Sequence, residues 1–250
     1  ESGKPDLDPA RELGYDPGFA CPWMDAGIYP HFERLVVQED ADFITVRDDR
    51  GITRRDRRDG HSMPEFLGYP VRTRDDWERL KAERLNPADP RRLPESWEPF
   101  REQVRRSGAA VQVGWFPYGV FGTPRDLLGA EELLLAFYTD PEMVRDMMQH
   151  LTTLWITLWS AMAQAVPIAH IHIWEDMSGR QGSLISPAMV AEFMLPCYDR
   201  IVAFARGAGV PIVSVDTDGD CSELVPLMRR HGINMFFPFE VQAGNDIRAY

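Results

Sequence analysis

Carboxylate side chains follow three successive apolar segments of this sequence, at the point where each segment ends. The segments are residues 169–174, 211–215 and 233–239. Acids gathered at one opening repel one another unless they bind a cation, share protons or have basic partners. The pattern therefore predicts a metal site or an acid–base site. The five acids are Glu175, Asp176, Asp216, Asp218 and Glu240.

The turn Asp216-Thr217-Asp218-Gly219 is the most specific of these patterns. Its two acids occupy alternate positions, and Gly219 allows a turn that aims both carboxylates inward. An acid after a strand often caps the next helix, and that alternative applies to each acid singly. Caps alone do not require two acids on alternate positions, so three such strand ends in a row favour a site.

Two histidines and one arginine have two interpretations each. His170 and His172 alternate along one segment and so share a face. We interpret them as hydrogen-bonded packing residues, with metal ligation as the alternative. Arg125 could hold a substrate carboxylate through two of its guanidinium nitrogens, or could form an ion pair at the surface.

Strands and helices alternate from residue 109 onwards, which predicts a parallel sheet with crossover helices. In a barrel of this kind the carboxyl ends of the strands form the active face, where the acids would meet. No GxGxxG or P-loop sequence follows any strand, which disfavours a nucleotide-binding open sheet. The predicted strands are 109–115, 169–174, 211–215 and 233–239, and the predicted helices start near Asp140, Ser186 and Glu223.

The first part of the chain, residues 1–108, is an elaborated entry to the single domain that we expect over 1–250. Residues 41–53 predict a strand, a turn around Gly51 and a returning strand. A short helix opens at Asp75 and ends before Asn86.

Composition excludes several classes of partner. The formal net charge of −12 disfavours binding to nucleic acid and to anionic membranes, because both repel an acidic surface. Three widely spaced cysteines indicate reduced thiols. No stretch approaches the ~18 apolar residues that a membrane helix needs, and no signal peptide is visible. We therefore expect a cytoplasmic protein.

Several motifs resemble the uroporphyrinogen decarboxylase superfamily, in a decarboxylase-like branch related to corrinoid-dependent methyltransferases. The resemblance implies a (β/α)8 TIM barrel. Only four parallel strands are evident, and the chain begins with Glu1 and ends at Tyr250, so we expect a barrel truncated at both ends. The motifs are Ile173-Trp-Glu-Asp-Met-Ser-Gly, Leu184-Ile-Ser-Pro, Glu192-Phe-Met-Leu-Pro, Val215-Asp-Thr-Asp-Gly and Pro238-Phe-Glu-Val-Gln-Ala-Gly.

The superfamily that these motifs resemble contains two chemistries. Its decarboxylases remove acetate carboxyl groups from a porphyrinogen without a cofactor. Its methyltransferases move a methyl group to or from a corrinoid protein and hold zinc with a His-x-Cys-Gly motif. Here residues 216–219 fall where that motif would be, which implies harder oxygen ligands in place of a thiolate site. An Arg-Gln-Ala-Gly-Arg-like segment typical of the decarboxylases is absent.

The leading hypothesis is methyl transfer from a small methylated substrate, with a divalent metal such as zinc and a corrinoid on a partner protein. Asp216, Asp218 and Glu240 would lie at the metal or the reacting group, with Glu175 and Asp176 as acid–base or supporting groups. The expected substrate-binding residues are Arg125, Trp174 and Gly219. By analogy with the family, a homodimer is expected.

Two alternatives stay open. In porphyrinogen decarboxylation an inward carboxylate would stabilise a protonated pyrrole, and Arg125 would hold an acetate side chain. The other alternative is a barrel that binds a ligand without catalysis.

Overall fold

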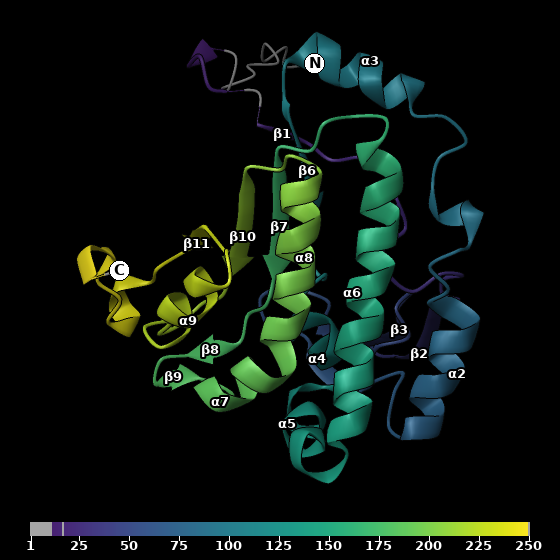
Figure 1. Cartoon of the computed structure of the whole chain (residues 1–250). Helices are drawn as coiled ribbons and strands as arrows, with labels where there is room; N and C mark the ends of the chain where they lie inside the picture. The colour runs from purple at the N-terminus through teal and green to yellow at the C-terminus, as the bar shows by residue number, and fades with distance from the viewer. Residues whose placement is uncertain (1–11, 17, 250) are drawn as a thin grey trace.

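A five-stranded parallel sheet lies at the centre of the molecule (Figure 1). The computed structural model describes residues 12–16 and 18–249. The strand order is β1-β6-β7-β10-β11, and every neighbouring pair is parallel. The strands are β1 (Phe19–Ala20), β6 (Ala110–Gly114), β7 (His170–Trp174), β10 (Ile212–Asp216) and β11 (Met235–Phe237).

The two faces of this sheet differ in chemistry because side chains alternate along each strand. Apolar β-branched residues such as Ile171 and Val213 occupy one face and are buried. That face packs against α6 (Pro141–Ala163) and α8 (Leu195–Gly207), which lie side by side in front of the sheet (Figure 1). The opposite face carries polar residues: Gln112, His170, His172, Ser214 and Asp216.

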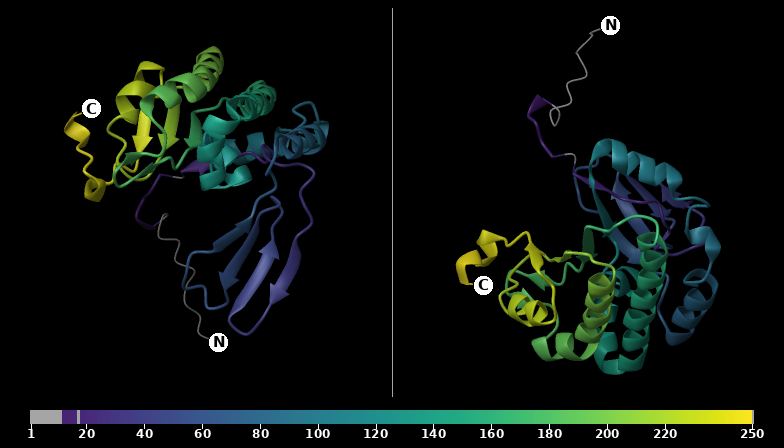
Figure 2. Two further views of the ribbon diagram at one scale, coloured as in Figure 1. Left: turned by 90° about the horizontal axis from the view of Figure 1, so that it is seen from below. Right: turned by 45° about the horizontal axis from the view of Figure 1, so that its top comes forward.

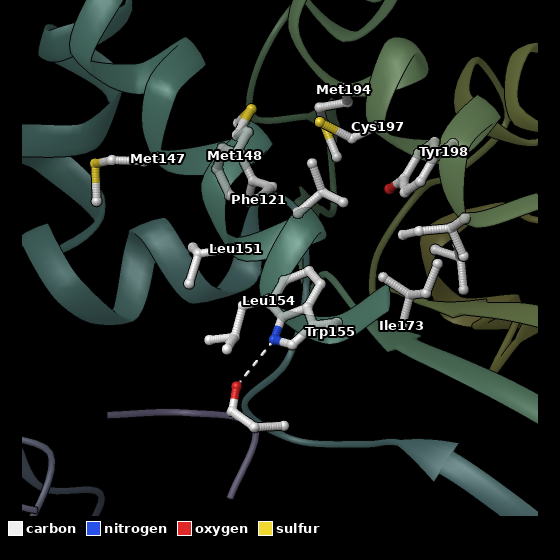
Figure 3. Close-up of a cluster of buried hydrophobic side chains, with 14 of the residues drawn as sticks. Phe121, Met147, Met148, Leu151, Leu154, Trp155, Ile173, Met194, Cys197 and Tyr198 are labelled. Carbon is white, nitrogen blue, oxygen red and sulfur yellow. Dashed lines mark hydrogen bonds between the residues drawn. The ribbon is translucent and has the colours of Figure 1, made fainter. Parts of the chain in front are cut away.

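Helix α6 begins as its sequence predicts. The Asp140 side chain accepts a hydrogen bond from the backbone N–H of Met143, and Pro141 occupies the first turn. Residues three and four apart then form one buried stripe. Figure 3 shows this stripe packed with residues of α8, and the Trp155 Nε1–H donates to the carbonyl oxygen of Ala26 at 3.0 Å.

Shorter elements surround this core. Ser186 caps α7 (Pro187–Met189), and a π-helical turn at Val190–Met194 connects it to α8. A small hairpin is formed by β8 (Ser178–Gly179) and β9 (Gly182–Ser183). The other helices are α2 (Arg74–Arg84), α3 (Glu98–Ser107), α4 (Gly122–Leu128), α5 (Ala130–Thr139) and α9 (Leu224–Arg230), with 3-10 turns at Pro90–Arg92, Val241–Ala243 and Ile247–Ala249.

A separate antiparallel sheet lies on the side of the parallel sheet away from α6 and α8 (Figure 2). The turn between its second and third strands contacts the main body, where Arg50 pairs with Asp126 and lies 5.3 Å from the ring centre of Phe116. Its strands, in order, are β2 (Leu35–Glu39), β3 (Phe43–Arg47), β4 (Thr53–Arg57) and β5 (Glu65–Gly68).

The four strands predicted after residue 109 and their parallel pairing are confirmed. The complete (β/α)8 barrel is not confirmed, because the described residues form a mixed α/β fold whose central sheet has five parallel strands. Strand β1 was not predicted, because two residues give no alternation to detect. No helix in the described part of the chain combines the length and the apolar character needed to cross a bilayer.

Arg92 connects residues 25–29 to the end of α2. Its side chain is fully buried, and a buried guanidinium is stable only when its N–H groups are hydrogen-bonded. Here it donates to five backbone carbonyl oxygens, those of Asp25, Gly27, Tyr29, Arg84 and Asn86.

Replacing Arg92 with Met should lower the free energy of unfolding by about 3–5 kcal/mol, because several buried carbonyls lose their donors. Urea denaturation measures this loss. The matched control is Arg91→Met, since Arg91 is exposed and pairs with Asp89 at the surface; its cost should stay below about 1 kcal/mol. Equal costs for the two variants would contradict the assigned role.

Candidate functional site

Backbone hydrogen bonds join the carboxyl ends of β7, β10 and β11. The N–H groups of Glu175 and Asp176 both donate to the carbonyl oxygen of Asp216, at 2.9 and 3.1 Å. The N–H of Thr217 donates to the carbonyl oxygen of Phe237 at 3.2 Å. These bonds hold the ends of three strands at one edge of the sheet, which is where the sequence predicted that the acids meet.

Glu175 is the one predicted acid that is completely buried. Its Oε1 accepts from the Val120 N–H and the Tyr198 hydroxyl, and its Oε2 accepts from the Phe121 and Gly122 N–H groups. The three backbone donors lie at the start of α4, where N–H groups without a partner in the helix favour an anion. Burial raises the pKa of Glu175, and the four donors oppose that rise.

Gly119 explains how the loop before α4 comes so close to β7. A Cβ atom at this position would lie 1.7 Å from the carbonyl oxygen of Trp174, so a side chain there would displace the loop. With the loop this close, the buried Glu175 side chain connects β7 to the backbone at residues 120–122 and does not face the opening.

Asp176 and Arg125 form an ion pair beside Trp174. The Arg125 Nη2 lies 2.7 Å from Asp176 Oδ2, and its Nη1 donates to the Asp176 carbonyl oxygen at 2.5 Å. The guanidinium also lies 5.1 Å from the centre of the Trp174 ring, within cation–π range. Arg125 therefore forms an ion pair with Asp176, and its expected contact with a substrate carboxylate stays a prediction.

Asp216 stands at the end of a buried polar row on the sheet. The Ser214 hydroxyl contacts His170 Nε2 at 2.6 Å and His172 Nδ1 at 2.9 Å, and His172 Nε2 faces Asp216 Oδ2 at 3.8 Å. Because Ser214 has one proton, it donates to one imidazole and accepts from the other. The histidines are thus hydrogen-bonded packing residues, as predicted.

The ionisable groups of this row are shifted toward their neutral forms. Burial lowers the pKa of His172 to about 4, with a smaller effect from His170. Burial also raises the pKa of Asp216 to about 6, and the charges of Asp218 and Asp176 act in the same direction. Asp216 can therefore carry a proton near neutral pH, which is a requirement for a general acid.

Asp218 and Glu240 lie in the loops that follow β10 and β11. Burial raises the pKa of Asp218, with further contributions from the charges of Glu240 and Asp176. Glu240 Oε2 accepts from the N–H of Gly219 at 2.7 Å, and its Oε1 accepts from the Gln242 side chain. Gly219 has φ +75°, and a Cβ there would lie 2.5 Å from the Gly179 carbonyl oxygen, so its role is close packing within the turn.

The strand ends also carry strained backbone and aromatic rings that the sequence did not single out. Trp115, Asp176 and Phe239 have positive φ and follow β6, β7 and β11 respectively. Such strain in residues other than glycine concentrates at functional sites. Trp115 and Phe116 are 54% and 47% exposed, and their rings contact His172 and Trp174. The signal in the sequence is the loop segment Phe116-Pro117-Tyr118-Gly119, which closes the predicted strand 109–115.

The donor set does not fit a metal centre in this conformation. No group of three or more His, Cys, Asp or Glu residues within the described ranges is arranged to hold an ion. Both Glu240 oxygens are engaged in loop hydrogen bonds, and the thiolate of the His-x-Cys-Gly motif is absent. The metal assignment to Asp216, Asp218 and Glu240 stays a prediction.

Replacing Glu175 with Gln should lower the free energy of unfolding by about 2–4 kcal/mol, because an amide nitrogen cannot accept from the N–H groups that meet one carboxylate oxygen. Chemical denaturation followed by circular dichroism measures the loss. The control Tyr198→Phe removes one donor of the four and should cost about 1–2 kcal/mol. A Gln variant as stable as the parent would remove the support for this capping role.

Replacing Asp216 with Asn should stabilise the protein by up to about 2 kcal/mol above pH 6. The pKa of Asp216 rises from 3.8 in the unfolded chain to about 6 in the folded protein. Between pH 3.8 and about 6 the folded protein holds a proton on Asp216 that the unfolded chain has lost. The free energy of unfolding therefore falls as pH rises through this range, and the uncharged Asn side chain avoids that loss. Near pH 4 the difference should vanish, as urea midpoints measured from pH 4 to 8 would show.

Asp220→Asn is the control for this pH series. The N–H of Ser222 lowers the pKa of Asp220, so the ionised form is the one stabilised by folding. This variant should therefore be less stable than the parent above pH 4. The same sign for both variants would contradict the electrostatic assignment of Asp216.

Comparison with known proteins identifies the family of this chain. A search of curated proteins gives no match. Among solved structures the chain is similar to a methyltransferase from Methanosarcina mazei, with 12% identity and a TM-score of 0.43. That match covers 70% of this chain and 49% of the other, so this chain spans about half of its length. The model of the uroporphyrinogen decarboxylase (URO-D) family matches residues 44–240, well over half of the sequence. The chain therefore belongs to the uroporphyrinogen decarboxylase family.

Proposed function

We propose that this chain is a methyl-transfer enzyme that acts on a small methylated substrate, with Asp216 as its general acid. The observation that carries the proposal is the position of Asp216. Its carboxyl group has a pKa of about 6 and faces a buried, neutral His172 at the carboxyl end of the sheet. A carboxylic acid whose pKa is raised to about 6 can hold a proton in mildly acidic to near-neutral solution and deliver it to a leaving oxygen or nitrogen.

The character of the opening favours a neutral or cationic methylated group. After burial, the charge of Asp176 contributes to the raised pKa values of both Asp216 and Asp218, and the half-exposed rings of Trp115 and Phe116 lie at the same edge. Carboxylates and aromatic faces attract cationic and methylated groups. A porphyrinogen carries many carboxylates, which this acidic edge would repel. Arg125, the group expected to hold one of them, is already paired with Asp176.

The proposed step breaks the bond between the methyl carbon and its heteroatom. The bonding electrons stay on the heteroatom, which takes the proton of Asp216, while the methyl group leaves to an acceptor. Asp216 becomes a carboxylate, and an Nε2–H tautomer of His172, with Nε2 3.8 Å from Asp216 Oδ2, would stabilise its charge through the N–H dipole. A corrinoid on a partner protein would supply the nucleophile that accepts the methyl group, and the exposed rings at the opening would suit a planar macrocycle.

The test is methyl transfer from methanol, methylamine or a neutral methoxy aromatic compound to free cob(I)alamin, followed by absorbance. We expect turnover that falls as pH rises above about 6, since Asp216 then loses its proton. Asp216→Asn should lower kcat by about 100-fold or more. Asp220→Asn should leave it unchanged, because Asp220 bonds its own loop at Ser222.

Two results would overturn the proposal. Release of carbon dioxide from uroporphyrinogen, without methyl transfer from any substrate tested, would assign decarboxylation instead. Tight binding of a methylated compound with no turnover in either assay would assign a non-catalytic binding role.

A further inference from the structure

A cavity of about 360 Å³ lies between the antiparallel sheet and α2, and none of its lining residues belongs to the acidic opening. Its volume is within the range of small-molecule sites. Four arginines line it, from three separate parts of the chain. Arg47 ends β3, Arg72 follows β5, and Arg79 and Arg84 lie on α2.

The register of the sheet explains one wall of this cavity. Arg47 pairs with Thr53 on β4, and Thr53 pairs with Gly68 on β5. All three residues line the cavity, so one row across the sheet presents a guanidinium, a hydroxyl and a glycine, which has no side chain to fill the space beside it. The Nη2 atom of Arg72 would lie 3.4 Å from a Cβ at Gly68, which places its guanidinium over that gap.

Two of the four arginines have partners within the protein. Arg79 forms an ion pair with Asp76, one turn earlier on α2. Arg84 donates to the carbonyl oxygen of His31 at 3.3 Å and lies 4.1 Å from the centre of the Phe32 ring. These contacts hold the two side chains in place along the helix side of the cavity.

The other two arginines have no such partner. The Arg47 Nε–H is buried and makes no hydrogen bond within the described residues. Neither its guanidinium nor that of Arg72 forms an ion pair or a side-chain hydrogen bond in the part of the chain that the structure describes. A buried donor without an acceptor is destabilising, and a bound anion would supply the missing acceptor.

The charge of the cavity is opposite to that of the chain. Its four arginines outnumber its two acids, Asp76 and Glu83, whereas the chain as a whole has a net charge of −12. Asp76 is also committed to Arg79 and to the cap of α2. The positive potential of this cavity attracts an anionic ligand, whereas the negative charge of the remaining surface repels it. An anion is therefore expected to bind at the cavity and not elsewhere.

We propose that this cavity is a binding site for the phosphate or carboxylate group of a small ligand. Arg47 and Arg72 hold the oxyanion, because a guanidinium presents paired N–H donors that match two oxygens. The Thr53 hydroxyl supplies another donor, and the rings of Phe32 and Tyr69 flank the rest of the ligand.

The test is isothermal titration calorimetry of the whole chain with inorganic phosphate and, separately, with succinate, at constant ionic strength set by sodium chloride. We expect saturable binding of one anion per chain. Arg47→Gln and Arg72→Gln should each raise the dissociation constant at least fivefold, and the double variant should abolish binding. The tighter of the two probes identifies the ligand group as phosphate or carboxylate.

Arg57→Gln is the matched control, because Arg57 lies on β4 outside the cavity and pairs with Asp59 at the surface. It should bind the anion like the parent, and circular dichroism should show that all variants are folded. Heats that do not saturate with either probe would overturn the proposal. So would equal binding by the parent and by the folded Arg47→Gln protein.

Discussion

The four hydrogen bonds that the Glu175 carboxylate accepts are the constraint on which the candidate site depends. One carboxylate joins the end of β7, the start of α4 and the side of α8, through three backbone N–H groups and the Tyr198 hydroxyl. The next residue, Asp176, takes its position from that anchor, and both N–H groups of the pair bind the carbonyl of Asp216. The carboxyl edge of the sheet is thus positioned by an acid that does not face it. Burial makes the anchor strong, since no water competes for its donors.

The sequence predicted the framework well where periodicity and caps were clear. The strands at 169–174 and 211–215 and the helices after Asp140 and Ser186 formed because alternation, three-to-four spacing and caps all agreed there. Helices α3, α4 and α5 were missed. Neither α4 nor α5 has a side-chain cap, and α4 takes its anion from Glu175, more than fifty residues away in the chain. Such long-range contacts leave no local signal.

For the site, the sequence located the edge but not the roles of its members. Two neighbouring acids, Glu175 and Asp176, look equivalent in the sequence, yet one is buried and the other is paired with Arg125. Which of two adjacent side chains faces inward depends on the backbone turn, and Asp176 has φ +43°. The inward row of His172 and Ser214 was also hidden, because pairing between strands decides which residues share a row.

The single hydroxyl proton of Ser214 couples the protonation of Asp216 to the hydrogen bonds deeper in the sheet. With two neutral imidazoles on either side, the hydroxyl must point toward one of them, so the whole row has a direction. An ionised Asp216 favours a proton on His172 Nε2, which leaves its Nδ1 to accept from Ser214; a protonated Asp216 favours the reverse. Loss or gain of one proton at the rim is therefore transmitted to His170, two residues deeper in the strand, by reorientation of hydrogen atoms alone.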